Sequence, residues 1–214
     1  MTKKNDTLLI KTSWDEINLA DFIKISELEY NKKFERLNLT RSIKMIAALS
    51  NKSEKEIFKF SQEMYAPLLE KIAFVFNDTP KDLSRKPFDV GGKKYMFVED
   101  FGVLTAGEMI SVEQLLMDAA DNEKAFLPEL LAILVRPAIE YKGETGKKKY
   151  KPEDFETDNL ADRKALFMRE LMVPYFVNRI TAFMNGTETL GEITSPFSVR
   201  ITQIRKKLLK SLDL

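Results

Sequence analysis

The sequence predicts a mainly α-helical α+β fold, with a helical bundle-like core, short β-hairpin insertions and a C-terminal amphipathic helix. Three observations indicate this class. Apolar residues recur at helical spacing over most of the chain. Two glycine-containing segments, 91–92 and 143–146, have the pattern of tight hairpin turns. The last segment, 198–212, places its apolar residues on one helical face.

The N-terminal part begins with a predicted strand over residues 8–12, followed by a helix over 19–29. Ser13 precedes Glu16 at capping-box spacing, but Asn18 is the better cap for this helix. The strand and the helix therefore meet at a corner. Trp14, the only tryptophan, is expected to anchor that corner against the core.

Three further helical segments are expected before residue 78. Thr40 is a candidate cap for a helix over 41–50, and Ser53 forms a capping-box pattern with Glu56. Ser61 is expected to cap a longer helix whose apolar positions run to Phe76. Pro67 either kinks that helix or moves its start to a later residue.

The remainder of the chain alternates predicted hairpins with predicted helices. The hairpins are expected to pair 88–90 with 93–98, and 139–141 with 148–150. The sequence pattern of residues 99–112 does not distinguish between helix, strand and loop. The helices are expected to start near Ser111 and then to cover 123–135, closed by Pro137, 159–171 and 174–186. A loop over 185–196 precedes the terminal helix.

Length and composition favour one globular domain over residues 1–214, which divides most naturally into parts 1–78 and 87–214. Apolar residues make up 44 % and charged residues 31 %, as in a folded soluble protein. The net charge of +1 creates no overall field that would attract a polyanion. No window approaches the roughly 18 apolar residues of a membrane span, so no membrane partner is expected.

The absence of histidine and cysteine excludes whole classes of chemistry. A zinc site with these ligands, a Ser-His-Asp triad and a cysteine nucleophile all need them. Carboxylate, lysine or tyrosine catalysis and oxygen-ligated magnesium or calcium remain available. The acidic clusters, including 153–158, have the pattern of solvated loops. The sequence therefore predicts that the protein is not an enzyme and holds no cofactor or metal.

Two segments are locally basic. One is the run Lys147 to Lys149 with Lys151, and the other is the C-terminal helix with five cations and one aspartate over 195–214. Three roles are open for that helix. It packs on its own domain, docks on a partner protein, or contacts phosphate groups of a nucleic acid. The candidate partner-contact residues are Leu9, Ile10, Trp14, Lys147, Lys148, Ile201, Ile204, Arg205, Leu208 and Leu212.

Three segments carry a resemblance to a known group of proteins. They read LLIKTSWDEINLADFIKI, SNKSEKEIFKF…LLEKIAFV, and LLAILVRPAIEYKGE followed by Ala165-Leu166-Phe167 and the stretch from Tyr175 to Phe183. This order resembles small virion or tail-assembly proteins of tailed bacteriophages, especially crAss-like phages of Bacteroidetes. The shared features are packing signatures, so they transfer no catalytic residue.

The resemblance implies a structural or assembly role within a virion that is assembled in the host cytoplasm. The expected function is that of a ring or connector subunit of the portal–tail region, or of an internal cargo protein. Other phage structural proteins and further copies of the chain are the expected partners. A tail-assembly chaperone and a packaged protein that contacts nucleic acid are alternatives. A carboxylate enzyme with a divalent metal is the alternative from a different class.

Overall fold

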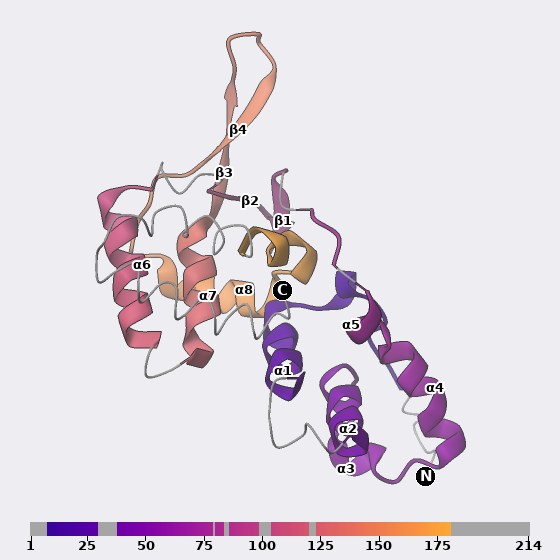
Figure 1. The fold of residues 1–214 in the computed structure, drawn as a ribbon. Helices are drawn as coiled ribbons and strands as arrows, with labels where there is room; N and C mark the ends of the chain where they lie inside the picture. Colours follow the sequence, from indigo (N-terminus) through magenta and orange to yellow (C-terminus); the bar gives the residue numbers. More distant parts are fainter. Residues whose placement is uncertain are drawn as a thin grey trace, which may run out of the picture.

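The computed structural model describes residues 8–29, 38–78, 80–83, 86–98, 104–119 and 123–180. Within these ranges the chain forms eight α-helices and one four-stranded antiparallel sheet (Figure 1). The predicted mainly helical α+β class is therefore confirmed. The predicted C-terminal helix over 198–212 and the loop over 185–196 lie outside the described residues.

The N-terminal part consists of a short 3-10 helix and five α-helices. These are η1 (Trp14–Glu16), α1 (Leu19–Glu29), α2 (Asn38–Ala48), α3 (Glu54–Ile57), α4 (Gln62–Ile72) and α5 (Phe74–Asn77). The Asn18 side chain accepts a hydrogen bond from the Asp21 backbone N–H at 2.9 Å, which confirms Asn18 as the cap of α1. The capping box of Ser53 and Glu56 at α3 is also confirmed.

Four predictions for this part are corrected. Residues 8–12 form only an isolated bridge between Ile10 and Ser50, because a short loop is the only partner edge available to them. The Glu16 carboxylate accepts hydrogen bonds from the backbone N–H and the hydroxyl of Thr12, and the Ser13 side chain makes no capping hydrogen bond. Thr40 lies inside α2, which already begins at Asn38. Ser61 is the N-cap residue of α4, as predicted, but the helix ends at Ile72 instead of running to Phe76, and α5 follows it as a separate helix.

The second part contributes three long helices and the sheet. Their bounds are β1 (Phe88–Val90), β2 (Lys93–Phe97), α6 (Ala106–Ala119), α7 (Glu123–Leu134), β3 (Val135–Lys142), β4 (Lys148–Pro152) and α8 (Leu160–Glu170). Both predicted hairpins are present. Gly91 and Gly92 both have positive φ, 57° and 75°, so they form the two-residue turn that matches the twist of the flanking strands.

Two boundaries in this part differ from the prediction. Helix α6 begins at Ala106, not near Ser111, because Thr105 and Glu108 form a capping box: the Thr105 backbone N–H donates to Glu108 at 2.7 Å. Helix α7 ends at Leu134, one residue before the predicted end, and passes directly into β3. Pro137 closes the helix as predicted, because the residues before a proline favour extended backbone.

The two hairpins form one sheet in the order β1-β2-β3-β4. Strand β2 pairs antiparallel with β3, so that Tyr95 lies opposite Pro137 and Phe97 opposite Val135. This pairing joins residues about forty positions apart, so no local pattern in the sequence indicates it. Helix α8 packs behind the sheet, where Phe167 meets the Tyr95 ring edge-on at 5.2 Å between centroids.

After α8 the chain makes a 3-10 turn, η4 (Val173–Tyr175), and becomes α-helical from residue 177. The predicted helix over 174–186 therefore starts three residues later, and its part beyond Ile180 lies outside the described residues. The segment around η4 is tied to the N-terminal part by backbone hydrogen bonds from Leu19 to Leu171, 2.8 Å, and from Val173 to Ile17, 2.9 Å.

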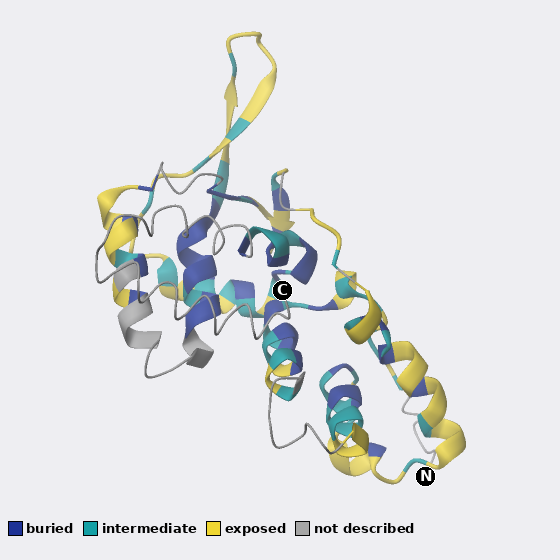
Figure 2. Ribbon diagram, in the orientation of Figure 1, coloured by how far each residue is buried: buried dark blue, intermediate teal, exposed yellow. Residues whose placement is uncertain are grey.

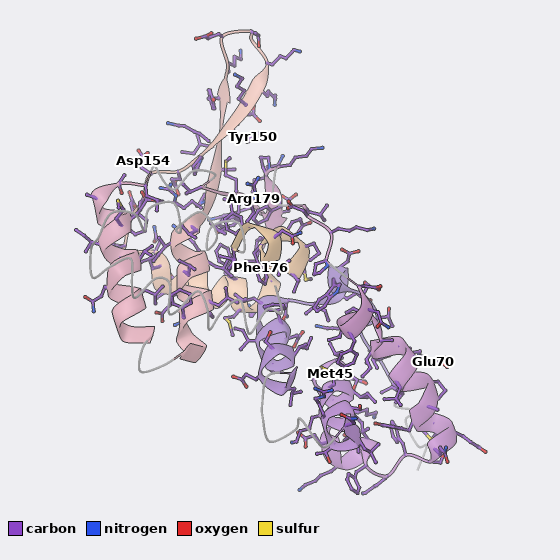
Figure 3. The ribbon with its side chains drawn as sticks, viewed as in Figure 1. Met45, Glu70, Tyr150, Asp154, Phe176 and Arg179 are labelled. Atoms are coloured by element: carbon purple, nitrogen blue, oxygen red, sulfur yellow. The ribbon has the colours of Figure 1, made fainter. Side chains whose placement is uncertain are left out.

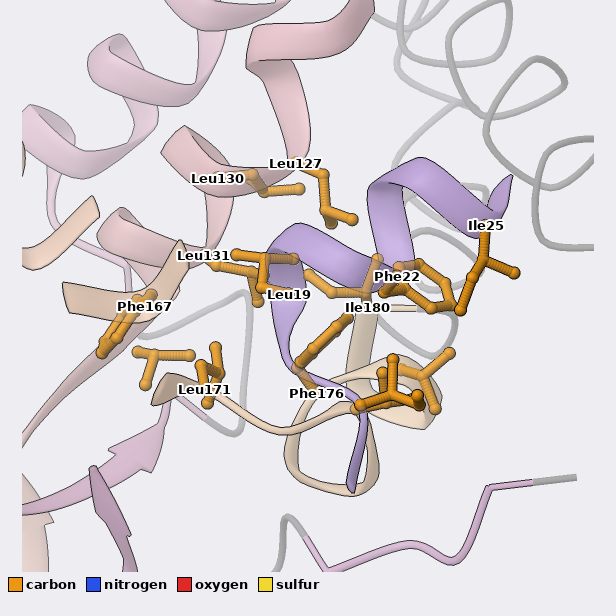
Figure 4. Close-up of a cluster of buried hydrophobic side chains, with 14 of the residues drawn as sticks. Leu19, Phe22, Ile25, Leu127, Leu130, Leu131, Phe167, Leu171, Phe176 and Ile180 are labelled. Atoms are coloured by element: carbon orange, nitrogen blue, oxygen red, sulfur yellow. The ribbon is translucent and has the colours of Figure 1, made fainter. Parts of the chain in front are cut away.

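The hydrophobic core is one continuous cluster drawn from both parts of the chain. Helix α1 contributes Leu19 and Phe22, which lie beside Leu131 of α7 and Phe176 after α8 (Figure 4). The Phe22 and Phe176 rings meet edge-on with centroids 5.5 Å apart. Figure 2 shows that burial is concentrated around α7 and α1, whereas α4 and the β3–β4 hairpin are largely exposed.

Candidate interaction surfaces

The β3–β4 hairpin extends away from the body of the molecule (Figure 1). Residues 138–152, called the ribbon below, pair from Ala138 opposite Pro152 to Lys142 opposite Lys148. The turn is closed by a hydrogen bond from the Gly143 N–H to the Lys147 carbonyl at 2.9 Å. The ribbon contains five lysines and two glutamates, a net charge of +3, whereas the whole chain carries +1. It is therefore a locally basic arm.

One face of the ribbon, called the paired face, carries an ion pair and two side-chain hydrogen bonds. Lys148 Nζ lies 2.9 Å from Glu140 Oε1, and the Tyr150 hydroxyl donates to the same carboxylate at 3.3 Å. Lys94 Nζ donates to the Tyr150 hydroxyl at 3.4 Å and lies over its ring. The hydrogen bond from Lys148 lowers the pKa of Glu140, and the same bond raises the pKa of Lys148. Glu140 thus offsets the charge of Lys148, whereas Lys142, opposite Lys148, leaves this face with a net charge of +1.

The opposite face, called the open face, carries different side chains. Successive residues of a strand alternate between faces, and residues directly opposite share one. The open face therefore presents Ile139 beside Lys151 and Tyr141 beside Lys149. Ile139 is 40 % exposed and Tyr141 is 42 % exposed. Among the described residues neither lysine has a hydrogen-bond or ion-pair partner.

A buried ion pair fixes the root of the ribbon. Arg136 of β3 lies 3.1 Å from Glu108 of α6, which is fully buried. Burial lowers the pKa of Arg136, and the Glu108 carboxylate opposes that shift. Arg163 of α8, also buried, donates to the Ala132 carbonyl at 2.8 Å. These contacts connect β3 to α6, and α8 to α7, so that the ribbon leaves the body in a set direction.

The N-terminal candidates lie at the other end of the molecule. The backbone of Leu9 exchanges hydrogen bonds with Asn51, and the Leu9 side chain is exposed. Ile10 packs against the core. Trp14 is half-buried beside Phe74, with ring centroids 5.3 Å apart, and its indole N–H donates to the Asp78 carbonyl at 2.9 Å. Trp14 thus anchors the corner before α1, as the sequence indicates.

Of the remaining candidate partner-contact residues, those that the structure describes do not lie near Leu9, Ile10 and Trp14. Lys147 lies in the ribbon turn and Lys148 on the paired face, distant from the N-terminal segment (Figure 1). Ile201, Ile204, Arg205, Leu208 and Leu212 lie outside the described residues. The sequence indicated the hairpin and its lysine run but did not assign side chains to faces. Counting alternate positions outward from the Gly143 turn would have given that assignment.

Apolar side chains are exposed on two further surfaces. Around α3 and α4, a region called the α3–α4 surface, Phe58 is 77 % exposed, and Met64 and Leu69 are also exposed. The α6 surface consists of Met109 and Ile110, the latter 64 % exposed. Helices α4 and α6 lie on opposite sides of the molecule (Figure 1). The two surfaces are therefore separate from each other.

No cluster of three or more acidic residues positioned to hold a metal ion occurs in the part of the chain that the structure describes. The acidic segment 153–158 is mostly exposed and follows β4 at the ribbon root, where Figure 3 shows Asp154 below Tyr150. Over the same described ranges, no helix is long and apolar enough to cross a membrane.

Comparison of the chain with protein-family models, with curated proteins and with solved structures gives no match.

Proposed function

We propose that this protein is a non-enzymatic structural or assembly protein of a tailed bacteriophage. In this role it is a virion component, a ring or connector subunit of the portal–tail region that acts through protein–protein contacts. The resemblance of its sequence to small virion and tail-assembly proteins supports the phage context. The structural observation that supports contact-based function is the exposure of apolar side chains on opposite sides of the molecule.

Covering these side chains would stabilise an assembly. Moving a Phe or Ile side chain from full exposure to full burial contributes roughly 1.5–3 kcal/mol. The α3–α4 and α6 surfaces together expose Phe58, Met64, Met109 and Ile110. A single exposed apolar residue needs no explanation. Two separate groups, each with a side chain at least 64 % exposed, are what two subunit interfaces would leave on the free protein.

The placement of the two surfaces favours a head-to-tail assembly. A two-fold dimer uses the same patch on both copies, whereas a ring joins one patch to a different patch on the next copy. The α3–α4 surface and the α6 surface are distinct and lie on opposite sides (Figure 1). Contacts of this kind close into a ring when the rotation per subunit divides a full turn.

Light scattering on single-surface variants tests the proposal. We expect the wild-type chain to form a closed oligomer, and Phe58→Asp and Ile110→Asp each to give monomers. Mixed in equal amounts, the two variants should form dimers only, because each retains one intact and complementary surface. Leu83→Asp is the matched control, since Leu83 is exposed but belongs to neither surface, and it should leave the mass unchanged.

A wild-type chain that stays monomeric at every concentration would contradict self-assembly. If that monomer binds unassembled tail components through Phe58 or Ile110, the alternative role of a tail-assembly chaperone is supported instead. An internal cargo protein would be monomeric as well but would remain with the particle after purification.

A further inference from the structure

The ribbon is not used by the proposed ring contacts, and its open face continues the core-facing side of the sheet. At the root this side carries Tyr95 and Val135, both buried, and Tyr95 packs against Phe167 of α8. Beyond Pro137 the same side carries Ile139 and Tyr141, which are exposed. Apolar and aromatic side chains therefore continue along this side of the sheet beyond the part that α8 covers.

The open face carries two lysines and no acidic residue, a net charge of +2, whereas the paired face carries a net charge of +1. On the paired face, Lys148 is neutralised by Glu140, and Lys94 lies against Tyr150. On the open face, Lys149 and Lys151 have no partner among the described residues. A ligand that fits this face is therefore anionic, and it presents flat or apolar groups between its charges.

The spacing of these side chains matches nucleic acid. Lys149 and Lys151 are two residues apart on one strand, a rise of about 6.6 Å, which is close to the separation of successive phosphates along a nucleic acid strand. Tyr141 lies directly opposite Lys149, so that its ring is adjacent to the first of these cations. Aromatic rings between cations are the usual platform on which unpaired bases stack.

We propose that the open face of the ribbon binds single-stranded nucleic acid without sequence preference. Lys149 and Lys151 contact successive phosphates, and Tyr141 stacks on a base. An acidic protein segment would satisfy the lysines but would make no specific use of the tyrosine ring beside Lys149. The observations therefore favour nucleic acid, and an acidic polypeptide becomes an outcome of the test.

Fluorescence anisotropy with a labelled oligothymidine of 20 nucleotides tests the proposal on the full chain. Lys149→Gln with Lys151→Gln should weaken binding at least tenfold at 50 mM salt. Because each phosphate contact on a single strand contributes about 0.7 to the salt slope, the same double variant should lower that slope by about 1.4. Lys142→Gln with Lys148→Gln removes the same charge from the paired face and should weaken binding less than threefold.

Tyrosine variants distinguish stacking from charge. Tyr141→Ala should weaken binding several-fold, whereas Tyr141→Phe, which keeps the ring, should bind like the wild type. All of these side chains are exposed or half-exposed, so circular dichroism spectra should be unchanged. Absence of binding at 50 mM salt would overturn the proposal, as would equal losses in both lysine pairs. Equally tight binding of a polyglutamate peptide by the wild type would also overturn it, because the partner would then be an acidic polypeptide.

Discussion

At the scale of single residues, the capping box at α3 shows how a local pattern determines local energetics. The Glu56 carboxylate accepts hydrogen bonds from the Ser53 backbone N–H at 2.8 Å and from its hydroxyl at 2.7 Å. These bonds, from the hydroxyl first, lower the pKa of Glu56 from 4.5 to about 2. The charged carboxylate is therefore favoured in the folded chain.

This shift predicts a defined pH dependence. Because the folded pKa is below the unfolded value, the contribution of Glu56 to stability is fully present above pH 4.5 and is lost as the pH falls towards 2. Urea midpoints measured between pH 5 and pH 2 should fall more steeply for the wild type than for Glu56→Gln, which keeps an acceptor without a charge. Parallel curves for the two proteins would show that this carboxylate contributes nothing to the acid dependence.

At the scale of elements, the turn between β1 and β2 packs against α8, where Gly91 lies beside Leu166. Gly91 has φ of 57°, and a Cβ built on it would lie 2.8 Å from Leu166 Cδ1. Gly92 has φ of 75°, but a Cβ there would have no neighbour within 4 Å. The two adjacent glycines thus share a left-handed backbone and differ in their surroundings.

This difference predicts unequal effects of the same substitution. Gly92→Ala should destabilise the protein by about 1–2 kcal/mol, the cost of a left-handed conformation with a Cβ. Gly91→Ala should cost about 1 kcal/mol or more beyond that, because the added methyl group overpacks the contact with Leu166. Urea unfolding of both variants measures the difference. Equal losses would mean that the Leu166 side chain moves away from the added methyl group at little cost.

At the scale of the whole molecule, the two parts of the chain share one core. Trp14 packs on Phe22, Phe22 packs on Phe176, and the backbone of residues 17–19 is bonded to that of 171–173. An element at the start of the sequence therefore depends on residues more than 150 positions later. Folding of the N-terminal helices is coupled to that of α8 and the sheet.

This coupling predicts a single unfolding transition. Fluorescence of Trp14, the only tryptophan, should change at the same guanidinium concentration as the far-ultraviolet circular dichroism. Phe176→Ala should lower both midpoints together, with a loss of about 3–5 kcal/mol. A fluorescence midpoint that stays in place while the other moves would show that the N-terminal part unfolds independently.

The elements that the sequence predicted correctly are those with a local cause. Asn18 and the Ser53–Glu56 pair identified helix starts, and the Gly91-Gly92 dipeptide identified a hairpin. The start of α6 was missed although Thr105 and Glu108 carry the same capping signal. The assumed strand over 8–12 failed because an extended segment needs a partner edge, which a strand sequence does not itself supply.

By itself, the sequence determined the fold class, the positions of most helices, both hairpin turns and the lack of histidine and cysteine chemistry. These features depend on periodicity, caps, glycine conformations and composition, which are properties of residues close in the chain or of the chain as a whole. Only the tertiary structure decided that β2 pairs with β3, that α1 packs beside Phe176, and that the ribbon has one face with an ion pair and one without. These follow from contacts between distant residues, such as Lys94 with Tyr150, whose energies depend on which surfaces meet in space.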